Sequence, residues 1–326
     1  MDEALVVLDD VRTYYQVRKG LLSKPLYVKA VDGVSLHLRR GEALALVGES
    51  GCGKTTLGKT ALRLLVPHSG RVMFDGKDIT HAKEKELKWF RRRAQMIFQD
   101  PYSSLDPMYT IYHTLSEPLM IHNVGTREER YERVCKALEE VKLTPPEDFI
   151  PKYPHMLSGG QMQRVNIARA MILEPDFVVA DEPVTMLDAS IRAEILMLLK
   201  ELMERHDIAF LYITHDMATA KYFSKRVAVM YAGKIVEVGE FREVVHNPMH
   251  PYTKALIEVV PEPDPSNRLK KRRTVAGEPP NLVNPPPGCR FHPRCPEAMA
   301  VCSEWEPELV EVSSGRWVSC HLYEKA

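Results

Sequence analysis

The sequence has little of what marks a secreted or membrane-spanning protein. Its first ten residues, MDEALVVLDD, are acidic and lack the basic and apolar blocks of a signal peptide. No window approaches the roughly 18 uninterrupted apolar residues that a spanning helix needs. We therefore expect a cytoplasmic chain that reaches a membrane only through partners.

An excess of charge of either sign is also missing, since 44 Lys and Arg residues balance 44 Asp and Glu residues. Balanced charge creates no global field that would attract nucleic acid or an anionic membrane surface. We therefore expect no nucleic-acid partner. With 326 residues, 44% of them hydrophobic, the chain can bury the core of one large domain or two.

Cysteine is scarce until the end of the chain, where four of the six cysteines stand after residue 288. Their spacing is C-x5-C-x6-C-x17-C, and they are Cys289, Cys295, Cys302 and Cys320. Cytoplasmic thiols are normally kept reduced, so clustered cysteines indicate metal or redox chemistry before structural disulfides.

Short apolar runs alternate with helical patterns as far as about residue 258, which predicts an α/β fold. Residues 42–47, 177–180 and 208–213 are apolar on both faces, as buried parallel strands are. Residues 100 to about 165 contain no comparable strand and predict a helical subdomain, with one apolar face formed by Tyr131, Val134, Leu138 and Val141.

The composition changes at the end of this region and predicts three parts. Residues 1–258 form the α/β domain, residues 259–288 a proline-rich linker over the surface, and residues 289–326 a small cysteine-rich extension. The α/β unit is not repeated within the chain, so we expect a single copy of it.

Residues 48–55, GESGCGKT, fit the Walker A pattern and stand between an apolar strand and a helical pattern. The glycines at 48, 51 and 53 let the backbone wrap closely around phosphate. We expect Lys54 to bring a positive charge to the outer phosphates and Thr55 a hydroxyl to Mg²⁺. The ATP-binding residues predicted in this loop are Gly48, Ser50, Gly51, Gly53, Lys54, Thr55 and Thr56.

An apolar strand that ends in two carboxylates, FVVADE at 177–182, is typical of a Walker B strand. We expect Asp181 to hold Mg²⁺, directly or through water, and Glu182 to polarise the attacking water. Two acidic residues after a strand also serve as a helix N-cap. Their place downstream of a Walker A loop favours the catalytic interpretation.

With these two motifs in this order, LSGGQ at 157–161 resembles the signature of the ABC transporter ATPase family. The resemblance implies a RecA-like P-loop NTPase core with an antiparallel β subdomain and the inserted helical subdomain. It also implies that ATP is held between Walker A of one subunit and the signature of another. Such a signature presents backbone donors at a helix N-terminus, here from Ser158, Gly159, Gly160 and Gln161.

Three more residues match the family pattern by position. Gln99 resembles the glutamine that senses the γ-phosphate and Mg²⁺ and hinges the helical subdomain. His215 resembles the switch histidine that contacts the γ-phosphate, and Asp188 resembles the aspartate that communicates across the dimer. The resemblance therefore implies Glu182, His215 and Gln99 as catalytic residues and Thr55, Gln99 and Asp181 as the residues around Mg²⁺.

Adenine is usually held in this family by an aromatic ring ahead of Walker A, and the family pattern favours Tyr15 over Tyr14. Packing of both rings in a β-sheet is the alternative. Met156 and Met186 depart from the family pattern near the expected dimer interface, where they could alter coupling or partner choice.

The cysteine tail resembles the C-terminal extension of the oligopeptide and dipeptide branch of the family, as do DPYSSLDP at 100–107 and NPMHPYTKAL at 247–256. This resemblance implies a [4Fe-4S] cluster on the four cysteines, with a structural or redox-sensing role. Zinc, and metal-free thiols or disulfides, are the alternatives, although zinc sites commonly pair cysteines two to four residues apart.

The resemblance implies an ATP-hydrolysing subunit of an importer of oligopeptides or dipeptides, peripheral on the cytoplasmic face of the cell membrane. Its partners would be a second, homologous ATPase, two permease subunits and, indirectly, an extracytoplasmic solute-binding protein. Residues 18–36 together with LSGGQ resemble the second member of such an ATPase pair. Importers of oligosaccharides or nickel, a soluble ABC ATPase of DNA repair or translation, and a redox or metal sensor are the alternatives.

Overall fold

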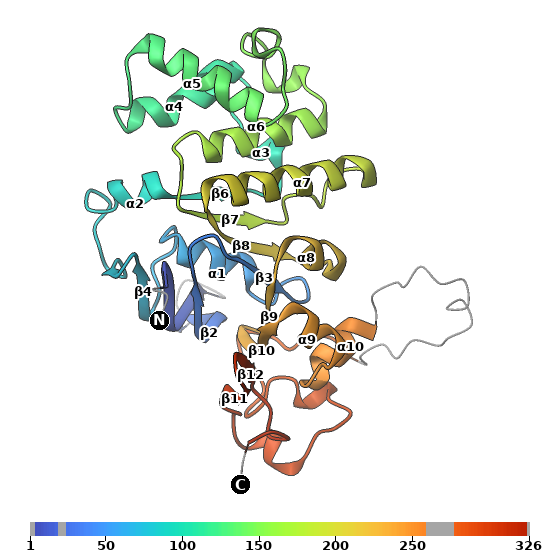
Figure 1. Ribbon diagram of the computed structural model, residues 1–326. Coiled ribbons are helices and arrows are strands. Elements are labelled where there is room, and N and C mark those ends of the chain that lie inside the picture. Colours follow the sequence, from blue (N-terminus) through green and yellow to red (C-terminus); the bar gives the residue numbers. More distant parts are fainter. Residues whose placement is uncertain (1–3, 19–23, 259–276, 325–326) are drawn as a thin grey trace, which may run out of the picture. The chain divides into compact units, whose positions relative to one another are not determined.

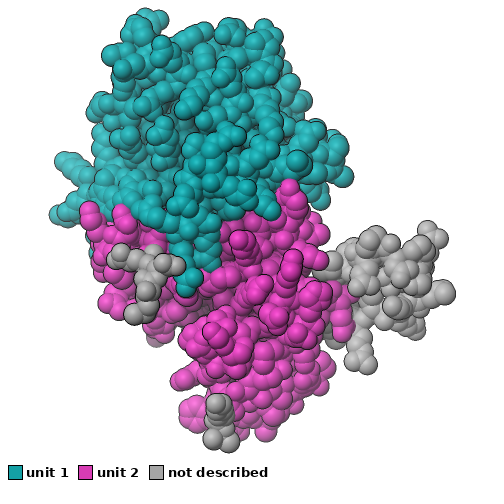
Figure 2. All heavy atoms as spheres, in the orientation of Figure 1, with its two compact units in different colours: residues 1–3, 39–42, 81–211 teal, residues 4–38, 43–80, 212–326 magenta. Residues whose placement is uncertain are grey.

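The computed structural model describes residues 4–18, 24–258 and 277–324, which belong to two compact units (Figure 2). Unit 1 comprises residues 39–42 and 81–211 of this range, and unit 2 comprises residues 4–38, 43–80 and 212–324. Residues 19–23 of the predicted insert and residues 259–276 of the predicted linker lie outside the described residues.

The strands are labelled in Figure 1. Their bounds are β1 Val6–Val17, β2 Leu26–Leu38, β3 Ala43–Val47, β4 Ser69–Phe74, β5 Lys77–Asp78, β6 Ala94–Ile97, β7 Phe177–Asp181, β8 Ala209–Thr214, β9 Arg226–Tyr231, β10 Lys234–Glu240, β11 Val310–Ser313 and β12 Arg316–Val318.

The α-helices are α1 Lys54–Ala61, α2 Lys88–Arg93, α3 Pro101–Ser104, α4 Ile111–Ile121, α5 Arg127–Glu140, α6 Gly159–Met171, α7 Ala189–His206, α8 Met217–Phe223, α9 Phe241–His246 and α10 Pro251–Glu258. Short 3₁₀ helices are η1 Pro146–Asp148, η2 Pro154–Met156, η4 His292–Arg294 and η5 Ala300–Ser303. Among the described residues, none of the helices is both long and apolar enough to cross a bilayer.

Unit 2 contains an antiparallel sheet in the order β2-β1-β4-β5. Its pairing register shifts near Asp10, which has a φ of 45°. Gly70 on β4 lies so close to this bulge that a Cβ there would be 2.3 Å from the Asp10 carbonyl oxygen. A glycine is therefore required where β4 lies against the bulge in β1. The sheet confirms the antiparallel β subdomain that the family resemblance implied.

Unit 2 also contains strands in the order β11-β12-β10-β9-β3. Strand β3 pairs with β9 in parallel, while β10 pairs with both β9 and β12 in antiparallel fashion. Every residue of β3 is buried, which confirms the strand predicted at 42–47 except for Glu42, which precedes it. The cysteine-rich extension adds β11 and β12 to this sheet beside β10, as Figure 1 shows in red.

Unit 1 contains the parallel pair β6 and β7 and the helices α2 to α7. Residues 98–176 are all described and contain no strand, which confirms the predicted helical subdomain. Helix α5 begins at a capping box formed by Thr126 and Glu129. Of its predicted apolar face, Val134 and Leu138 are fully buried. Tyr131 was wrongly included, because its ring remains 44% exposed beside Tyr112.

Aromatic packing joins the extension to the rest of unit 2. The ring of Phe291 is 1% exposed and makes edge contacts with Tyr231 and Tyr252, at centroid distances of 5.1 and 5.5 Å. The guanidinium of Arg316 forms a buried ion pair with Glu237 of β10. Before the extension, the Leu282 carbonyl accepts a hydrogen bond from the Lys29 amide at 2.9 Å. The extension is thus integrated into unit 2.

Candidate nucleotide-binding site

The predicted Walker A loop connects buried β3 to α1 in unit 2. Helix α1 starts at Lys54, and Gly53 caps it with a φ of 112°. A Cβ on Gly53 would lie 2.0 Å from the Ala30 carbonyl oxygen, and one on Gly48 would lie 2.2 Å from the Met230 carbonyl oxygen. Glycine is therefore required at both ends of the loop, and the loop leads into the N-terminus of α1, where backbone amides can face an anion.

The Lys54 ammonium group lies against its own loop. Its Nζ donates hydrogen bonds to the carbonyl oxygens of Gly48 at 2.8 Å and Glu49 at 2.9 Å. The side chains of Ser50 and Thr55 are exposed at the loop and in the first helical turn. A cation enclosed by a curved glycine-rich loop at a helix N-terminus is the arrangement that binds phosphate.

The two tyrosines of β1 differ in their surroundings. The Tyr15 ring is 41% exposed, and its hydroxyl lies 3.2 Å from Oγ1 of Thr56 in α1. The Tyr14 hydroxyl instead donates to Asp32, and its ring stacks on His68 with a centroid distance of 5.2 Å. The accessible ring beside α1 is therefore that of Tyr15, as the predicted adenine contact requires.

In unit 1, two predicted catalytic residues meet where β6 and β7 end. The strands pair in parallel with Ile97 opposite Ala180, so the residues that follow them emerge at the same edge. Nε2 of Gln99 donates to Oε2 of Glu182 at 3.0 Å. Asp181, the last residue of β7, is 4% exposed, and Glu182 has a φ of 46°. A left-handed glutamate is uncommon, and such backbone geometry is concentrated at functional sites.

The predicted signature also starts a helix in unit 1. Ser158 is the N-cap of α6 and forms a capping box with Gln161. The Ser158 hydroxyl accepts a hydrogen bond from the Gln161 backbone amide, and the Gln161 side-chain oxygen accepts one from the Ser158 backbone amide. A Cβ on Gly160 would lie 2.8 Å from Ile191 of α7, so a larger residue would push the two helices apart. Gly159 occupies the first helical position.

One functional candidate near the signature, Gln163, was not among the residues predicted from the sequence. The Gln163 side chain in α6 is 1% exposed, and its amide donates to the Pro183 carbonyl oxygen at 2.8 Å. It ties the signature helix to the segment immediately after Glu182. The sequence shows only that Gln163 is a polar residue two positions after the signature. Its partner Pro183 lies 20 residues further along the chain, and the fold is needed to identify it.

The remaining predicted residues lie on exposed loops. Asp188 is exposed at the start of α7, and its side chain makes no capping hydrogen bond. His215 is exposed directly after β8, before Asp216 caps α8 through the Ala218 amide at 2.8 Å. Met156 and Met186 are 56% and 60% exposed, so neither is packed into the core of its unit.

All four cysteines of the extension are free thiols that lie within electrostatic range of one another. Burial raises the pKa of Cys289 and Cys320 to about 11, and like-charge repulsion between neighbouring thiolates adds to the effect. Within the described ranges, however, no group of three or more His, Cys, Asp or Glu residues is arranged to hold a metal ion. The geometry therefore does not support the predicted [4Fe-4S] cluster.

Comparison with known proteins agrees with this geometry. A family model described as "ABC transporter" matches residues 31–185. The "Oligopeptide transport ATP-binding protein AppF" of Bacillus subtilis (strain 168) is 45% identical over 324 residues, which cover 98% of this chain and 98% of that protein. The chain belongs to the ABC transporter family. It is an ATP-binding subunit of that family, in which ATP and Mg²⁺ are the expected ligands.

Two further matches extend the family assignment. A model described as "Oligopeptide/dipeptide transporter, C-terminal region" matches residues 236–302, where the extension joins the ABC domain. The ATP-binding cassette MJ0796, solved as a dimer bound to ADP and Pi, is 30% identical with a TM-score of 0.65. That match covers 73% of this chain and 99% of the cassette, so the nucleotide-binding fold is shared.

Proposed function

We propose that this ABC protein hydrolyses ATP to drive uptake of oligopeptides or dipeptides, as a peripheral subunit on the cytoplasmic face of the membrane. The observation that carries the proposal is the 45% identity over nearly the full length of both chains to an oligopeptide transport ATP-binding protein. The match at residues 236–302 to the C-terminal region of oligopeptide and dipeptide transporters supports the same branch.

Nucleotide binding would use the glycine-rich loop and the start of α1. The backbone amides around Gly51 and Gly53 and the ammonium of Lys54 would receive the phosphates, while the ring of Tyr15 stacks on the base. The closeness of Tyr15 to Thr56, at 3.2 Å, supports a single binding surface for base and phosphate. We assign residues 1–258 to the ABC domain and residues 289–326 to the extension.

Magnesium prefers hard oxygen ligands, and Thr55, Gln99 and Asp181 would supply them. When bound, Mg²⁺ neutralises charge that develops on the transferred phosphoryl group. Glu182 would accept a proton from the attacking water, and the hydrogen bond from Gln99 at 3.0 Å would orient its carboxylate. His215 would contact the γ-phosphate from the exposed loop after β8.

The complete site would need a second ATPase subunit, because the signature of one subunit faces the Walker A loop of another in this family. Ser158, Gly159, Gly160 and Gln161 would supply donors to the partner's nucleotide, and exposed Asp188 would contact the partner. Two permeases and an extracytoplasmic solute-binding protein would complete the importer. ATP binding to the closed dimer would drive the conformational change.

For the cysteine extension we retain the [4Fe-4S] cluster as a separate hypothesis, since four thiols are gathered within electrostatic range. The four thiols would have to rearrange to bind one, since the described residues hold no group arranged for a metal ion. Anaerobic purification followed by iron, sulfide and zinc analysis decides the matter. Stoichiometric iron and sulfide support the cluster, whereas stoichiometric zinc or no metal contradicts it.

The transport function is tested in the assembled complex. The tagged chain is recovered from detergent-solubilised membranes, its partners are identified, and the complex is reconstituted with its solute-binding protein. Peptide uptake that depends on ATP, with Lys54→Ala as the inactive control, supports the proposal. Uptake of an oligosaccharide or nickel but not peptide would reassign the solute. Recovery of nucleic acid or ribosomes in place of permeases would overturn the transport function.

A further inference from the structure

Glu49 is the second residue of the phosphate loop, and its carboxylate is held by the cysteine-rich extension. Nη1 of Arg294 lies 3.1 Å from Oε2 of Glu49, and Nη2 lies 3.3 Å from Oε1. The contact is therefore bidentate, with both nitrogens of the guanidinium fork paired. The side chain of Arg294 is 8% exposed and that of Glu49 29%, so the pair is largely shielded from water.

Two tyrosines of unit 2 support this pair. The Tyr231 hydroxyl accepts a hydrogen bond from Arg294 Nη1 at 3.1 Å, and the guanidinium lies 5.7 Å from the centre of the Tyr231 ring. The Tyr252 hydroxyl accepts a hydrogen bond from the Glu49 amide at 2.9 Å. Both the backbone and the side chain of Glu49 are thus fixed by residues far along the chain.

The same glutamate contacts the lysine of the loop. Its carbonyl oxygen accepts a hydrogen bond from Lys54 Nζ at 2.9 Å. Glu49 therefore connects Arg294 in the extension directly to the cation that is expected to bind phosphate. Lys54 contacts the backbone carbonyl oxygen of Glu49, whereas Arg294 contacts its carboxylate. The carboxylate therefore pairs with Arg294 and forms no ion pair with Lys54.

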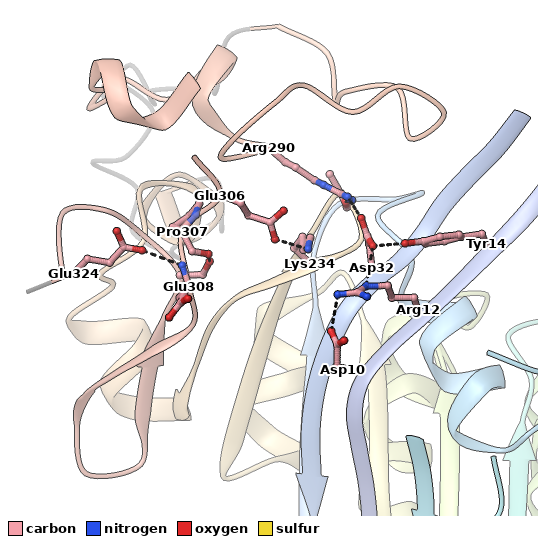
Figure 3. A network of polar contacts seen from close by, with 12 residues as sticks. Asp10, Arg12, Tyr14, Asp32, Lys234, Arg290, Glu306, Pro307, Glu308 and Glu324 are labelled. Atoms are coloured by element: carbon pink, nitrogen blue, oxygen red, sulfur yellow. Dashed lines mark hydrogen bonds and ion pairs between the residues drawn. The ribbon is translucent and has the colours of Figure 1, made fainter. Parts of the chain in front are cut away.

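A second arginine of the extension, Arg290, anchors the chain just before Arg294 to the rest of unit 2. Arg290 pairs with Asp32 and donates to the Ala232 carbonyl oxygen. Figure 3 shows Arg290 and Tyr14 approaching the Asp32 carboxylate from different sides. With Arg290 anchored beside β1 and β2, the following short helix η4 is held in a fixed place, and it ends at Arg294.

A carboxylate inside a loop that binds a polyanion is unfavourable unless its charge is compensated. Like charges that are partly shielded from water repel strongly, and the repulsion grows with the charge of the ligand. Arg294 supplies the compensating charge and binds the carboxylate in a bidentate geometry. A lysine would supply the same charge without that geometry.

We propose that Arg294 is a positioning residue of the ATP site, which acts through Glu49: it holds and neutralises the Glu49 carboxylate so that the phosphate loop accepts ATP. The cysteine-rich extension is thereby part of the nucleotide site. This inference rests on the proposed binding of ATP by the loop at residues 48–55.

The test measures dissociation constants for Mg-ATP and Mg-ADP by calorimetry on the full-length chain. Arg294→Gln should weaken ATP binding about tenfold, with a smaller loss for ADP because ADP carries less charge. Arg294→Lys keeps the charge and should recover most of the affinity. Glu49→Gln should bind ATP at least as tightly as the wild type, and the Glu49→Gln/Arg294→Gln double variant should regain near wild-type affinity.

The matched control is Glu306→Gln, which breaks the ion pair of the extension with Lys234 and leaves the Arg294 contacts in place. It should bind ATP like the wild type. Thermal unfolding of each variant separates a folding defect from a binding defect. If Arg294→Gln fails to fold, Glu49→Gln and Arg294→Lys still test the proposal. Charge compensation predicts wild-type or tighter ATP binding for Glu49→Gln and near wild-type binding for Arg294→Lys.

Wild-type ATP affinity in folded Arg294→Gln would overturn the inference. So would a Glu49→Gln variant that binds ATP as weakly as Arg294→Gln, since that would make the pair a purely structural link. Absence of ATP binding in the wild-type chain would instead refute the proposed function itself.

Discussion

Nε2 of Gln99 donates a hydrogen bond to Oε2 of Glu182 at 3.0 Å, although 83 residues separate the two in the sequence. The parallel pairing of β6 and β7 brings their ends to the same edge, and each residue follows one of these strands. Glu182 has a left-handed backbone, a geometry that is concentrated at functional sites. The contact orients the carboxylate that we assign to activation of water.

Replacement of Glu182 by Gln should reduce ATP hydrolysis at least about 100-fold while ATP binding is kept, because the amide cannot accept the proton of the attacking water. The assembled ATPase pair should then remain as an ATP-bound dimer, measured by size-exclusion chromatography with light scattering and by phosphate release. Glu201→Gln, at a surface pair with Lys142, should hydrolyse ATP normally. Unchanged hydrolysis in Glu182→Gln would remove Glu182 from the catalytic role.

Replacement of Gly53 by Ala should abolish ATP binding and destabilise unit 2. Its φ of 112° disfavours any side chain, and the new Cβ would collide with the Ala30 carbonyl oxygen at 2.0 Å. Gly51→Ala is the matched control, because its φ is 77° but no atom lies within 4 Å of its Cβ. Gly51→Ala should lower the free energy of unfolding by only about 1–2 kcal/mol, which is the cost of holding an alanine in a left-handed backbone conformation. Equal effects of the two variants on thermal unfolding would contradict this account, since Gly51→Ala controls for stability alone.

Replacement of Phe291 by Ala should lower the free energy of unfolding by about 3–5 kcal/mol, because it leaves a cavity beside Tyr231 and Tyr252. Urea denaturation measures the loss, and limited proteolysis shows whether the extension is released first. Trp305→Ala removes an aromatic ring of the same extension that is 69% exposed and should change stability by about 0.5 kcal/mol or less. A similar loss in both variants would argue against docking through Phe291.

The buried imidazole of His250 should make stability depend on pH. Burial lowers its pKa from the ordinary 6.5 to about 3, since the positive form is excluded from water. Below pH 6.5 the unfolded chain therefore binds a proton that the folded chain does not. Stability is lost as the pH falls from about 6.5 to about 3, at up to about 1.4 kcal/mol for each pH unit.

Unfolding midpoints measured across this pH range test the assignment to His250. Asn at position 250 should remove this part of the pH dependence, because an amide side chain does not titrate. His246→Asn, at an exposed position of α9, should keep the wild-type pH dependence. An unaltered pH profile in His250→Asn would show that another group is responsible.

Much of the fold was accessible from short stretches of sequence. The segments predicted as strands at 42–47 and 177–180 are buried parallel strands, because a segment that is apolar on both faces has to be covered on both. The Walker A glycines and the N-cap at Ser158 were also predictable, since loop conformation and capping depend on a few neighbouring residues. Helical periodicity alone failed at Tyr131, which is 44% exposed, because burial depends on tertiary packing that periodicity does not specify.

Short stretches of sequence therefore specify three local features: the phosphate loop, the two carboxylates at and just after the end of β7, and the signature helix. Tertiary structure alone decided which distant residues serve them. Arg294 reaches Glu49 across 245 positions and Arg290 reaches Asp32 across 258. Backbone preferences act over a few residues, whereas these pairs depend on strand order and on the packing of Phe291, which bring the end of the chain back to its phosphate loop.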